Sequence, residues 1–449
     1  MNEHGQGRLR GREIFRFWVP IAATWWMMSV EGPFIAAVIA RLPDLEYNLA
    51  AYGIAFSIGL FIEAPIMMLI SASVALVRDD RSYRKLMEFT FLLNGIITLC
   101  MLVIVIPGVF RWLSIGLMGL PEDLAGLAHM STILLIPWPA AIGFRRFYQG
   151  ILIHGKTTRR VAYGTVIRLA GMASTAMILA FRTDIPGAWI GCSALSVGVT
   201  VEAVATWLMA RHSIRLIRQR PGRPGRVLTY RVIWLFYYPL AMSSMMALGI
   251  RPVISFFVAH CPRPIESLAV LPVVHSASFL FVCFGLSFQE VALALMGDRF
   301  EGLRPVTGFA SQMAVILSAA ITVAAFSPLA RLWFMVVSDL PPHLTEFAML
   351  PFRLTIILPA LAVAHSMQRA VLVNAGWNAP ISRATALEVT AIGLAMVAMS
   401  KVIPVTGVIA AILSLGLGRC VSNAYLWIRT RSLLHHHGIR RDREKALQV

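Results

Sequence analysis

Charged residues are scarce in this chain of 449 residues: 14% are Asp, Glu, Lys or Arg, whereas 58% are apolar. A soluble domain carries about one quarter charged residues, so the composition excludes an ordinary soluble enzyme or binding domain. Cysteine is also rare, and the five cysteines show no paired spacing. A cysteine in an apolar segment packs as a small hydrophobic residue. We therefore expect no disulfide framework, no metal site and no cofactor.

In place of charge the sequence has long apolar runs. A helix needs about 20 apolar residues to cross the hydrocarbon core of a bilayer, and no stretch between the runs is long enough for a soluble domain. The twelve expected spans are 15–40, 49–77, 86–110, 124–150, 161–181, 187–210, 232–258, 268–296, 306–328, 348–371, 384–400 and 406–428. The runs predict an all-α polytopic membrane protein with twelve transmembrane helices.

Acidic residues are few, 22 against 40 basic residues, and the formal net charge is +18. The basic residues are unevenly distributed. Alternate connections, including both termini, hold 27 of them, whereas the six connections between hold one each. Because positively charged loops stay in the cytoplasm, we expect a multi-pass protein of the plasma (inner) membrane with both termini cytoplasmic. Its basic face would meet anionic lipid headgroups, and nucleic acid is not an expected partner.

The sequence contains two copies of one unit. Residues 17–33 (FWVPIAATWWMMSVEGP) and 236–252 (FYYPLAMSSMMALGIRP) carry proline at the same two places, at an offset of 219. An offset of 220 aligns Leu120-Pro121 with Leu340-Pro341. Each half has six expected helices, an even number, so both halves enter the membrane the same way up. Folds of this kind place the substrate near the bilayer midplane, between the repeats.

The repeat predicts four regions: an N-terminal six-helix bundle over 1–210, a basic cytoplasmic linker over 211–231, a C-terminal six-helix bundle over 232–428 and a basic cytoplasmic tail over 429–449. The shared prolines are candidate hinges, because proline removes a backbone hydrogen bond and bends a helix. These candidates are Pro20, Pro33, Pro239 and Pro252. The alternative, that the prolines only shape helix packing, stays open.

Charged residues also occur inside the expected spans, where a charge at the bilayer centre costs about 2.5–3.5 kcal/mol. They must pair with one another or line a watery cavity. The basic ones are Arg145, Arg146, Arg168, Arg251, Arg353, Arg369 and Arg419, and the acidic ones are Glu31, Glu63, Glu202, Glu290 and Glu388. All the cations are arginine, whose planar guanidinium binds carboxylate or phosphate through two parallel hydrogen bonds. Their excess favours an anionic substrate.

Provisional roles follow from sign and depth. We expect substrate binding by Arg251, Arg353, Arg419, Arg145, Arg146 and Arg369, the last three of which could instead reach lipid headgroups. We expect coupling or gating, with a proton or sodium as the coupling ion, at Glu31, Glu63, Arg168, Glu388, Glu202 and Glu290. Each acid could instead only neutralise an arginine. The stretches 31–33 (EGP) and 250–252 (IRP) are the same place in the two halves, marked by an acid in one and a base in the other. We expect Arg353 to join Arg251 at the anion.

One pattern is typical of an enzyme, but its context argues against that interpretation. Residues 150–157 (GILIHGKT) fit the phosphate-binding loop GxxxxGK[ST]. That loop needs a preceding strand and a following helix in an α/β unit, whereas here it follows a membrane span. No nucleophile, base and acid occur together in a credible context, so we expect no enzyme activity.

Several short stretches resemble the progressive ankylosis protein family, a branch of the multidrug and toxin extrusion-like (MATE-like) transporter superfamily. They are residues 49–57 (LAAYGIAFS), 150–152 (GIL), 236–241 (FYYPLA), 251–254 (RPVI) and 351–353 (PFR). The resemblance implies two six-helix bundles and the export of anions such as pyrophosphate, nucleoside triphosphate or citrate. Arg251 and Arg353 are the charged positions that match. Arg145-Arg146 stand where less basic residues are expected in animal members.

The sequence therefore favours a secondary transporter that moves a small multivalent anion by alternating access. Two alternatives remain from the same fold class: a flippase for an anionic lipid-linked precursor, and a MATE-type antiporter for cations or drugs. A membrane scaffold without transport is a third, and it leaves the buried charges unexplained.

Overall fold

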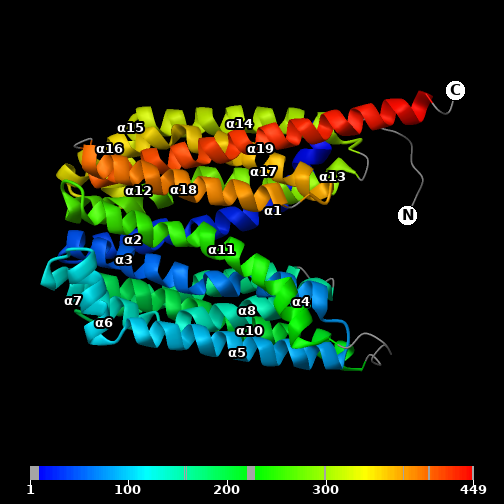
Figure 1. Ribbon diagram of the computed structural model, residues 1–449. Coiled ribbons are helices and arrows are strands. Elements are labelled where there is room, and N and C mark those ends of the chain that lie inside the picture. The colour runs from blue at the N-terminus through cyan, green and yellow to red at the C-terminus, as the bar shows by residue number, and fades with distance from the viewer. Residues whose placement is uncertain are drawn as a thin grey trace.

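The computed structural model describes residues 10–155, 157, 159–219, 228–297, 300–377, 379–402 and 405–446. Regular structure in these ranges is helical throughout. They contain twelve helical segments long and apolar enough to cross a membrane, as the apolar runs predict. Figure 1 shows the helices running along one common direction in two layers. Lys156 of the phosphate-loop pattern, 220–227 of the predicted linker and 447–449 of the predicted tail lie outside the described residues.

The first six spans form the N-lobe, and several of them are interrupted. The elements are α1 (Gly11–Ser29), α2 (Glu31–Ala40), α3 (Leu45–Glu63), η1 (Ala64–Met68), α4 (Leu69–Leu76), α5 (Asp80–Ile104), α6 (Pro107–Arg111), η2 (Trp112–Leu117), α7 (Glu122–Leu134), α8 (Pro137–His154), α9 (Arg159–Arg182) and α10 (Gly187–Arg218). The first span breaks at Val30. Pro33 explains this break, because a proline offers no N–H to the carbonyl four residues earlier.

The last six spans form the C-lobe and repeat the order of the first six spans, although the seventh span, unlike the first, is a single helix. They are α11 (Tyr230–Ala259), α12 (Pro264–Leu286), α13 (Phe288–Met296), α14 (Leu303–Phe326), α15 (Pro328–Leu332), η3 (Trp333–Val337), α16 (Pro342–Leu354), η4 (Thr355–Ile357), α17 (Leu358–Asn374), α18 (Ala379–Val402) and α19 (Gly407–Ala446). Pro239 and Pro252 lie inside α11, as Pro20 lies inside α1. These helices are continuous there, so the hinge role of the prolines stays a prediction.

Backbone details recur at the offsets that the sequence predicts. Asp44 and Arg263 are 219 residues apart, and both begin a helix with a left-handed φ, 51° and 54°. Gly119 and Asp339, 220 residues apart, also have positive φ, 67° and 50°. Such conformations are uncommon outside glycine. The two lobes are therefore copies of one six-helix unit in the same orientation, a parallel pseudo-two-fold repeat.

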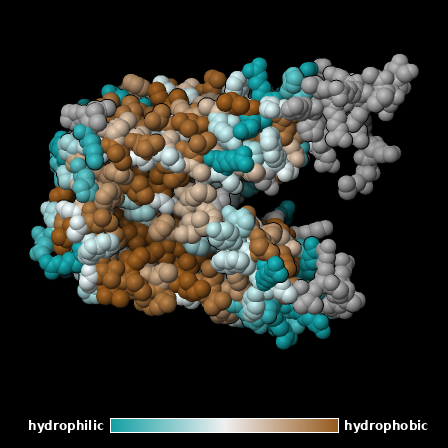
Figure 2. Space-filling model, viewed as in Figure 1, coloured by the Kyte–Doolittle hydropathy of each residue, from teal (hydrophilic) through white to brown (hydrophobic). Residues whose placement is uncertain are grey.

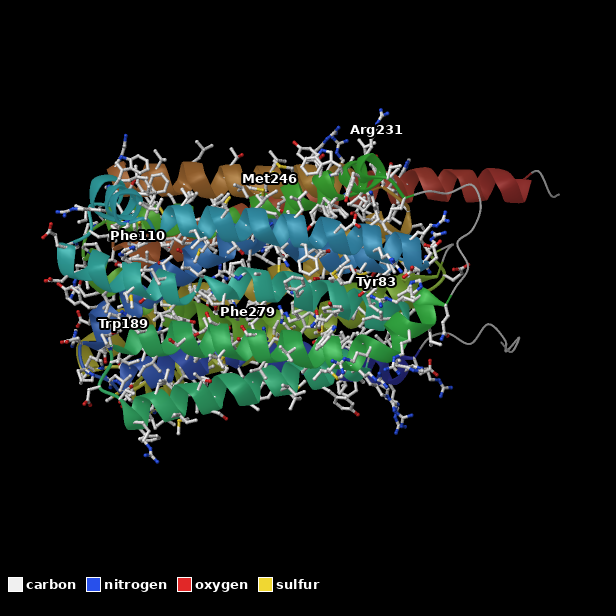
Figure 3. All side chains as sticks on the ribbon, turned by 90° about the horizontal axis from the view of Figure 1, so that it is seen from below. Tyr83, Phe110, Trp189, Arg231, Met246 and Phe279 are labelled. Atoms are coloured by element: carbon white, nitrogen blue, oxygen red, sulfur yellow. The ribbon has the colours of Figure 1, made fainter. Side chains whose placement is uncertain are left out.

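We call the end where α1 begins, α10 ends and α11 begins the terminal face, and the other end the opposite face. In Figure 3, Tyr83 and Arg231 lie toward the terminal face, whereas Phe110 and Trp189 lie toward the opposite face. Figure 2 shows a hollow between the lobes at the terminal face and continuous surface at the opposite face. The positive connections predict that the terminal face is cytoplasmic.

Contacts between the lobes close the opposite face. The Arg41 guanidinium donates to the carbonyls of Val336 (2.9 Å) and Val337 (3.0 Å). His343 Nε2 and Glu46 Oε1 lie 2.6 Å apart. Below this layer α3 packs along α12. Among the described residues, the lobes are therefore closed against each other at the opposite face and apart at the terminal face.

The halves of the first and seventh spans nearest the terminal face are exchanged between the lobes. α1 packs on α12, α13 and α14 of the C-lobe, and Trp18 Nε1 donates to Ser287 Oγ at 2.9 Å. α11 bends toward the N-lobe (Figure 1), where Tyr237 donates to the carbonyl of Pro65 and its ring contacts Phe89. Trp18 and Tyr237 are 219 residues apart, so equivalent positions of the two halves make the exchanged contacts.

Two long helices extend into regions that the sequence assigns to a linker and a tail. α10 continues to Arg218, inside the predicted linker 211–231, and α19 continues to Ala446, inside the predicted tail 429–449. Arginine is a good helix former, so a basic composition alone does not end a helix. α10 stops shortly before Pro221, which cannot continue it. The domain boundaries remain predictions at this level.

Candidate functional site

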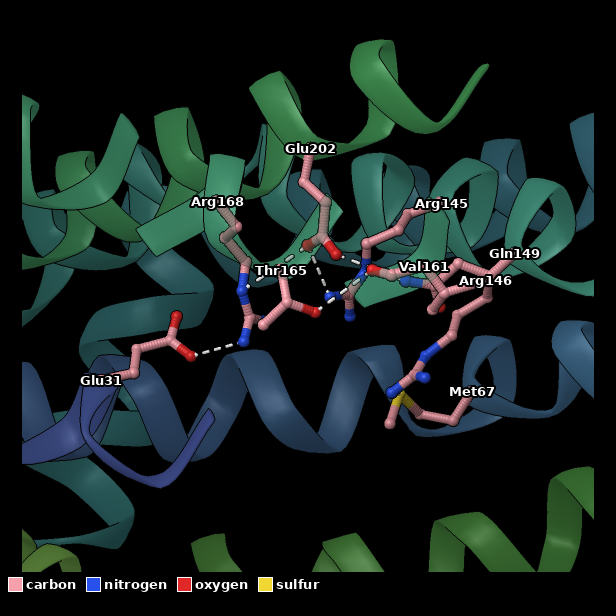
Figure 4. A network of polar contacts seen from close by, with 9 residues as sticks. All are labelled: Glu31, Met67, Arg145, Arg146, Gln149, Val161, Thr165, Arg168 and Glu202. Atoms are coloured by element: carbon pink, nitrogen blue, oxygen red, sulfur yellow. Dashed lines mark hydrogen bonds and ion pairs between the residues drawn. The ribbon is translucent and has the colours of Figure 1, made fainter. Parts of the chain in front are cut away.

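The deepest charged group in the N-lobe is Glu202, on α10, whose side chain is 0% exposed. Its Oε2 accepts from Arg145 Nη1 on α8 at 2.7 Å and lies 3.5 Å from Arg168 Nε on α9. Its Oε1 accepts from Gln149 Nε2 at 3.3 Å. Figure 4 shows side chains of α8 and α9 converging on this one carboxylate of α10. Glu202 thus serves as an internal anion that binds two arginines.

Arg168 connects this network to the broken first span. Its Nη2 lies 2.9 Å from Glu31 Oε2, and Glu31 is the first residue of α2. The Arg168 guanidinium therefore bridges carboxylates of α2 and α10 (Figure 4). A change in the charge of either carboxylate would therefore alter the electrostatic forces on the start of α2, next to the break at Val30. The network thus couples charge to the geometry of the first span.

Glu63 and Arg146 lie beside this network with incomplete pairing. Glu63 ends α3 and is 3% exposed, and in the described ranges its Oε2 has no hydrogen-bond partner. It lies within electrostatic range of Arg145, Arg146 and Arg168. Arg146 directs Nη2 to the Met67 sulfur at 3.7 Å. With Glu31 and Glu202, the N-lobe cluster holds equal numbers of arginines and glutamates.

The C-lobe holds a second cluster, on α17, α18 and α19. Arg419 Nη2 lies 3.2 Å from Glu388 Oε1, and the two side chains are 32% and 14% exposed. Arg369 lies within electrostatic range of both, and His365 lies within range of Arg369 and Arg419. This cluster has more arginine than glutamate, unlike the one in the N-lobe.

Arg251 contacts a residue that the sequence analysis did not identify. Its Nη2 lies 2.5 Å from His275 Nε2 on α12, so the partner of this guanidinium is a histidine and not a carboxylate. Tyr52 lies within electrostatic range of both Arg251 and Glu31, so one phenol is influenced by a charge from each lobe. A histidine inside an apolar span is the signal that could have identified His275.

In the described residues Arg353 and Arg251 contact different partners, so their joint binding of an anion stays a prediction. Arg353 Nε donates to the carbonyl of Ala325 at 3.4 Å, and its guanidinium lies 5.2 Å from the centre of the Phe326 ring. It thus turns toward the end of α14, where an aromatic face satisfies its charge in part. Glu290 is exposed at the start of α13, and no described residue forms an ion pair with it.

The described fold defines a class of membrane proteins: it is the fold of MATE transporters of the MOP superfamily. A multidrug resistance MATE family transporter in an inward-facing conformation matches with a TM-score of 0.73 and 14% identity, over 94% of this chain and 98% of that one. A MOP superfamily transporter from Pyrococcus furiosus, described as having a binding pocket of reverse polarity, matches at 0.68 with 15% identity (96% and 99% covered). The lipid II flippase MurJ, inward closed, matches at 0.69 with 14% identity (92% and 87%).

No protein-family model and no curated protein sequence matches the chain. The structural likeness, at these identities, establishes the fold alone. It agrees with the wider superfamily that the sequence resembles, whereas the narrower resemblance to the progressive ankylosis family stays a prediction.

Proposed function

We propose that the protein is a secondary membrane transporter that exports a small multivalent anion, such as pyrophosphate, a nucleotide or citrate, by alternating access. The observation that carries this proposal is the difference between the lobes. The N-lobe cluster balances arginine with glutamate, whereas the C-lobe cluster and Arg251 leave arginine in excess. A buried arginine needs an anionic or neutral acceptor, and a transported anion supplies one.

The arrangement of the lobes gives the transport cycle its starting state. The anion enters through the hollow at the terminal face, while Arg41 and the Glu46–His343 pair hold the opposite face closed. Exposed pairs of this kind contribute about 0–1 kcal/mol each. These polar contacts are therefore weak enough to be exchanged for new ones at the terminal face when the lobes rock.

The N-lobe supplies the coupling in this proposal. Glu63 has an oxygen without a partner among the described residues, in the midst of arginines, and Glu31 stands at the break of the first span. Binding of a proton or sodium at Glu31 would change the charge that Arg168 bridges, and binding at Glu63 would change the electrostatic field on the same arginines. That change would bias the conformation of the first span, which packs on the C-lobe through α1.

Two other classes of substrate are compatible with this fold: a lipid-linked headgroup and an organic cation. The Pyrococcus furiosus transporter is described as having a pocket of reverse polarity that suggests a different function, so pocket polarity differs among proteins of this fold. MurJ is a lipid II flippase, and a pyrophosphate-linked lipid headgroup would also suit an arginine-rich cavity. The excess of arginine argues against an organic cation.

Proteoliposome transport tests the proposal. The purified chain is reconstituted, and uptake and efflux of radiolabelled pyrophosphate, citrate and ATP are measured with and without proton and sodium gradients. We expect saturable movement of at least one of these anions, dependent on a gradient. Transport of none of them, together with flipping of a fluorescent lipid-linked pyrophosphate or movement of an organic cation, would overturn the proposal in favour of that substrate.

A further inference from the structure

The repeat allows the two charged clusters to be compared position by position. At an offset of 220, Glu202 corresponds to Ser422 and Gln149 corresponds to Arg369; in the same way Arg145 corresponds to His365 and Arg168 to Glu388. Every member of the network around the Glu202 carboxylate therefore has a counterpart in the C-lobe, and each counterpart differs in charge or in hydrogen-bonding chemistry.

The packing supports this correspondence independently of sequence. A Cβ added at Gly198 on α10 would lie 3.1 Å from the backbone oxygen of Arg168, and one added at Gly418 on α19 would lie 3.0 Å from that of Glu388. Both glycines permit the same close approach of two helices. Helices α9 and α10 therefore pair as α18 and α19 do, with equivalent positions of the repeat facing each other.

The carboxylate that organises the N-lobe cluster has no counterpart in the C-lobe. Ser422 takes its place and is 0% exposed. Among the described residues, Ser422 Oγ, Arg369 Nε and His365 Nδ1 have no hydrogen-bond partner. Polar atoms that are buried without a hydrogen-bond partner are costly, at about 1–3 kcal/mol each. Glu388 binds Arg419 but leaves Arg369 without a direct partner among the same residues.

The C-lobe cluster is also reachable. The Arg419 side chain is 32% exposed and that of Glu388 is 14% exposed, whereas Arg145 and Glu202 in the N-lobe are 6% and 0% exposed. An anion could therefore reach Arg419 from outside the bundle and contact the buried donors behind it.

We propose that Arg369, Arg419, His365 and Ser422 form an anion-binding site, in which a carboxylate or phosphate group of the ligand takes the place that the Glu202 carboxylate holds in the N-lobe. The two arginines bind the anion by charge-assisted hydrogen bonds, and the Ser422 hydroxyl and His365 donate the neutral ones. Glu388 offsets one of the two arginine charges and leaves the empty site with an excess of positive charge. This assignment rests on the proposed function and locates its substrate in the C-lobe.

Binding of pyrophosphate and of citrate to the full chain, measured by calorimetry in detergent, tests the site. Arg369→Gln introduces the residue that the repeat has at position 149, and Arg419→Gln removes the second cation. We expect each to weaken binding about 10-fold or more, the usual effect of losing a charge-assisted hydrogen bond. Ser422→Glu supplies an internal carboxylate and should abolish binding. Arg431→Gln, an exposed position on the same helix, is the matched control and should bind within 2-fold of wild type.

The outcomes separate the site from the function. Wild-type binding by both Arg369→Gln and Arg419→Gln, in a chain that transports anions, would overturn the site and leave the proposed function standing. Failure of the wild-type chain to bind or transport any anion would overturn both. If Ser422→Glu does not fold, the two arginine variants decide. Displacement of pyrophosphate in nanodiscs by phosphatidylglycerol, but not by phosphatidylcholine, would assign the site to lipid headgroups and overturn the small-anion ligand.

Discussion

Replacing Glu202 by glutamine would test whether the N-lobe network is held together by one shared anion. Glutamine has nearly the same shape, so the substitution removes charge without opening a cavity. Arg145 and Arg168 would then face each other without the carboxylate that both approach, at 2.7 and 3.5 Å. Removing one partner of a buried ion pair costs about 3–5 kcal/mol, whereas losing a neutral hydrogen bond costs about 0.5–1.5 kcal/mol. We expect the larger value.

Thermal unfolding followed by tryptophan fluorescence is the assay, since the chain has 11 tryptophans. With an unfolding entropy of about 2.1 cal/mol/K per residue, a loss of 3–5 kcal/mol lowers Tm of a chain of this length by about 3–5 °C. Glu122→Gln is the matched control. It breaks the pair with Arg111, in which both side chains are about 70% exposed, and should shift Tm by less than about 1 °C because exposed pairs contribute little.

A double variant completes the test. Arg145→Gln combined with Glu202→Gln removes one cation together with the anion, so it should be more stable than Glu202→Gln alone. A Glu202→Gln protein as stable as wild type, or a double variant less stable than both single variants, would show that the carboxylate is not the centre of this network.

Three further predictions address transport. Arg251→Lys keeps the charge but loses the planar guanidinium, so it should insert normally and lose most anion transport, as should Arg251→Ala; transport at the wild-type rate would remove Arg251 from the mechanism. Glu31→Gln and Glu63→Gln should flatten the dependence of transport on pH or sodium, and unchanged ion dependence in both would make these acids counter-charges only. Cross-linking of Glu46→Cys/His343→Cys by a short bis-thiol reagent that a reductant can cleave should hold the opposite face closed and stop transport until the reductant is added; continued transport by the cross-linked protein would contradict alternating access through that face.

Much of the fold could be predicted because hydropathy and the internal repeat are both visible in the linear sequence. Twelve apolar runs determine the number of spans, and the shared prolines and offsets predict two copies in one orientation. The break near Pro33 follows from the missing N–H. The exchange of α1 and of the start of α11 between lobes could not be predicted, because it depends on which lobe a helix face meets. Periodicity does not contain that information.

Which charged residues contact one another could be predicted even less well from the sequence. The sequence gives the approximate depth of Arg145, Arg353 and Glu202, but which of them face one another depends on the rotation of each helix about its axis. Arg353 shows the consequence: it is deep in the sequence pattern, yet it turns toward Phe326 instead of Arg251. The missing counterpart of Glu202 could have been found from the sequence alone. Aligning the two halves at the offset of 220 shows which charged positions differ between them as well as which positions match.

The exchanged segments have a consequence for how the chain is made. α1 is among the first segments synthesised, yet its packing partners α12, α13 and α14 come some 250 residues later. At about 5–20 residues per second, Trp18 would wait roughly 15–50 s for Ser287 to exist. The N-lobe likewise lacks the cover that Tyr237 gives to Pro65 and Phe89 until the seventh span is made. Neither half can finish folding before the other has begun, so each lobe remains an incomplete bundle in the bilayer during synthesis.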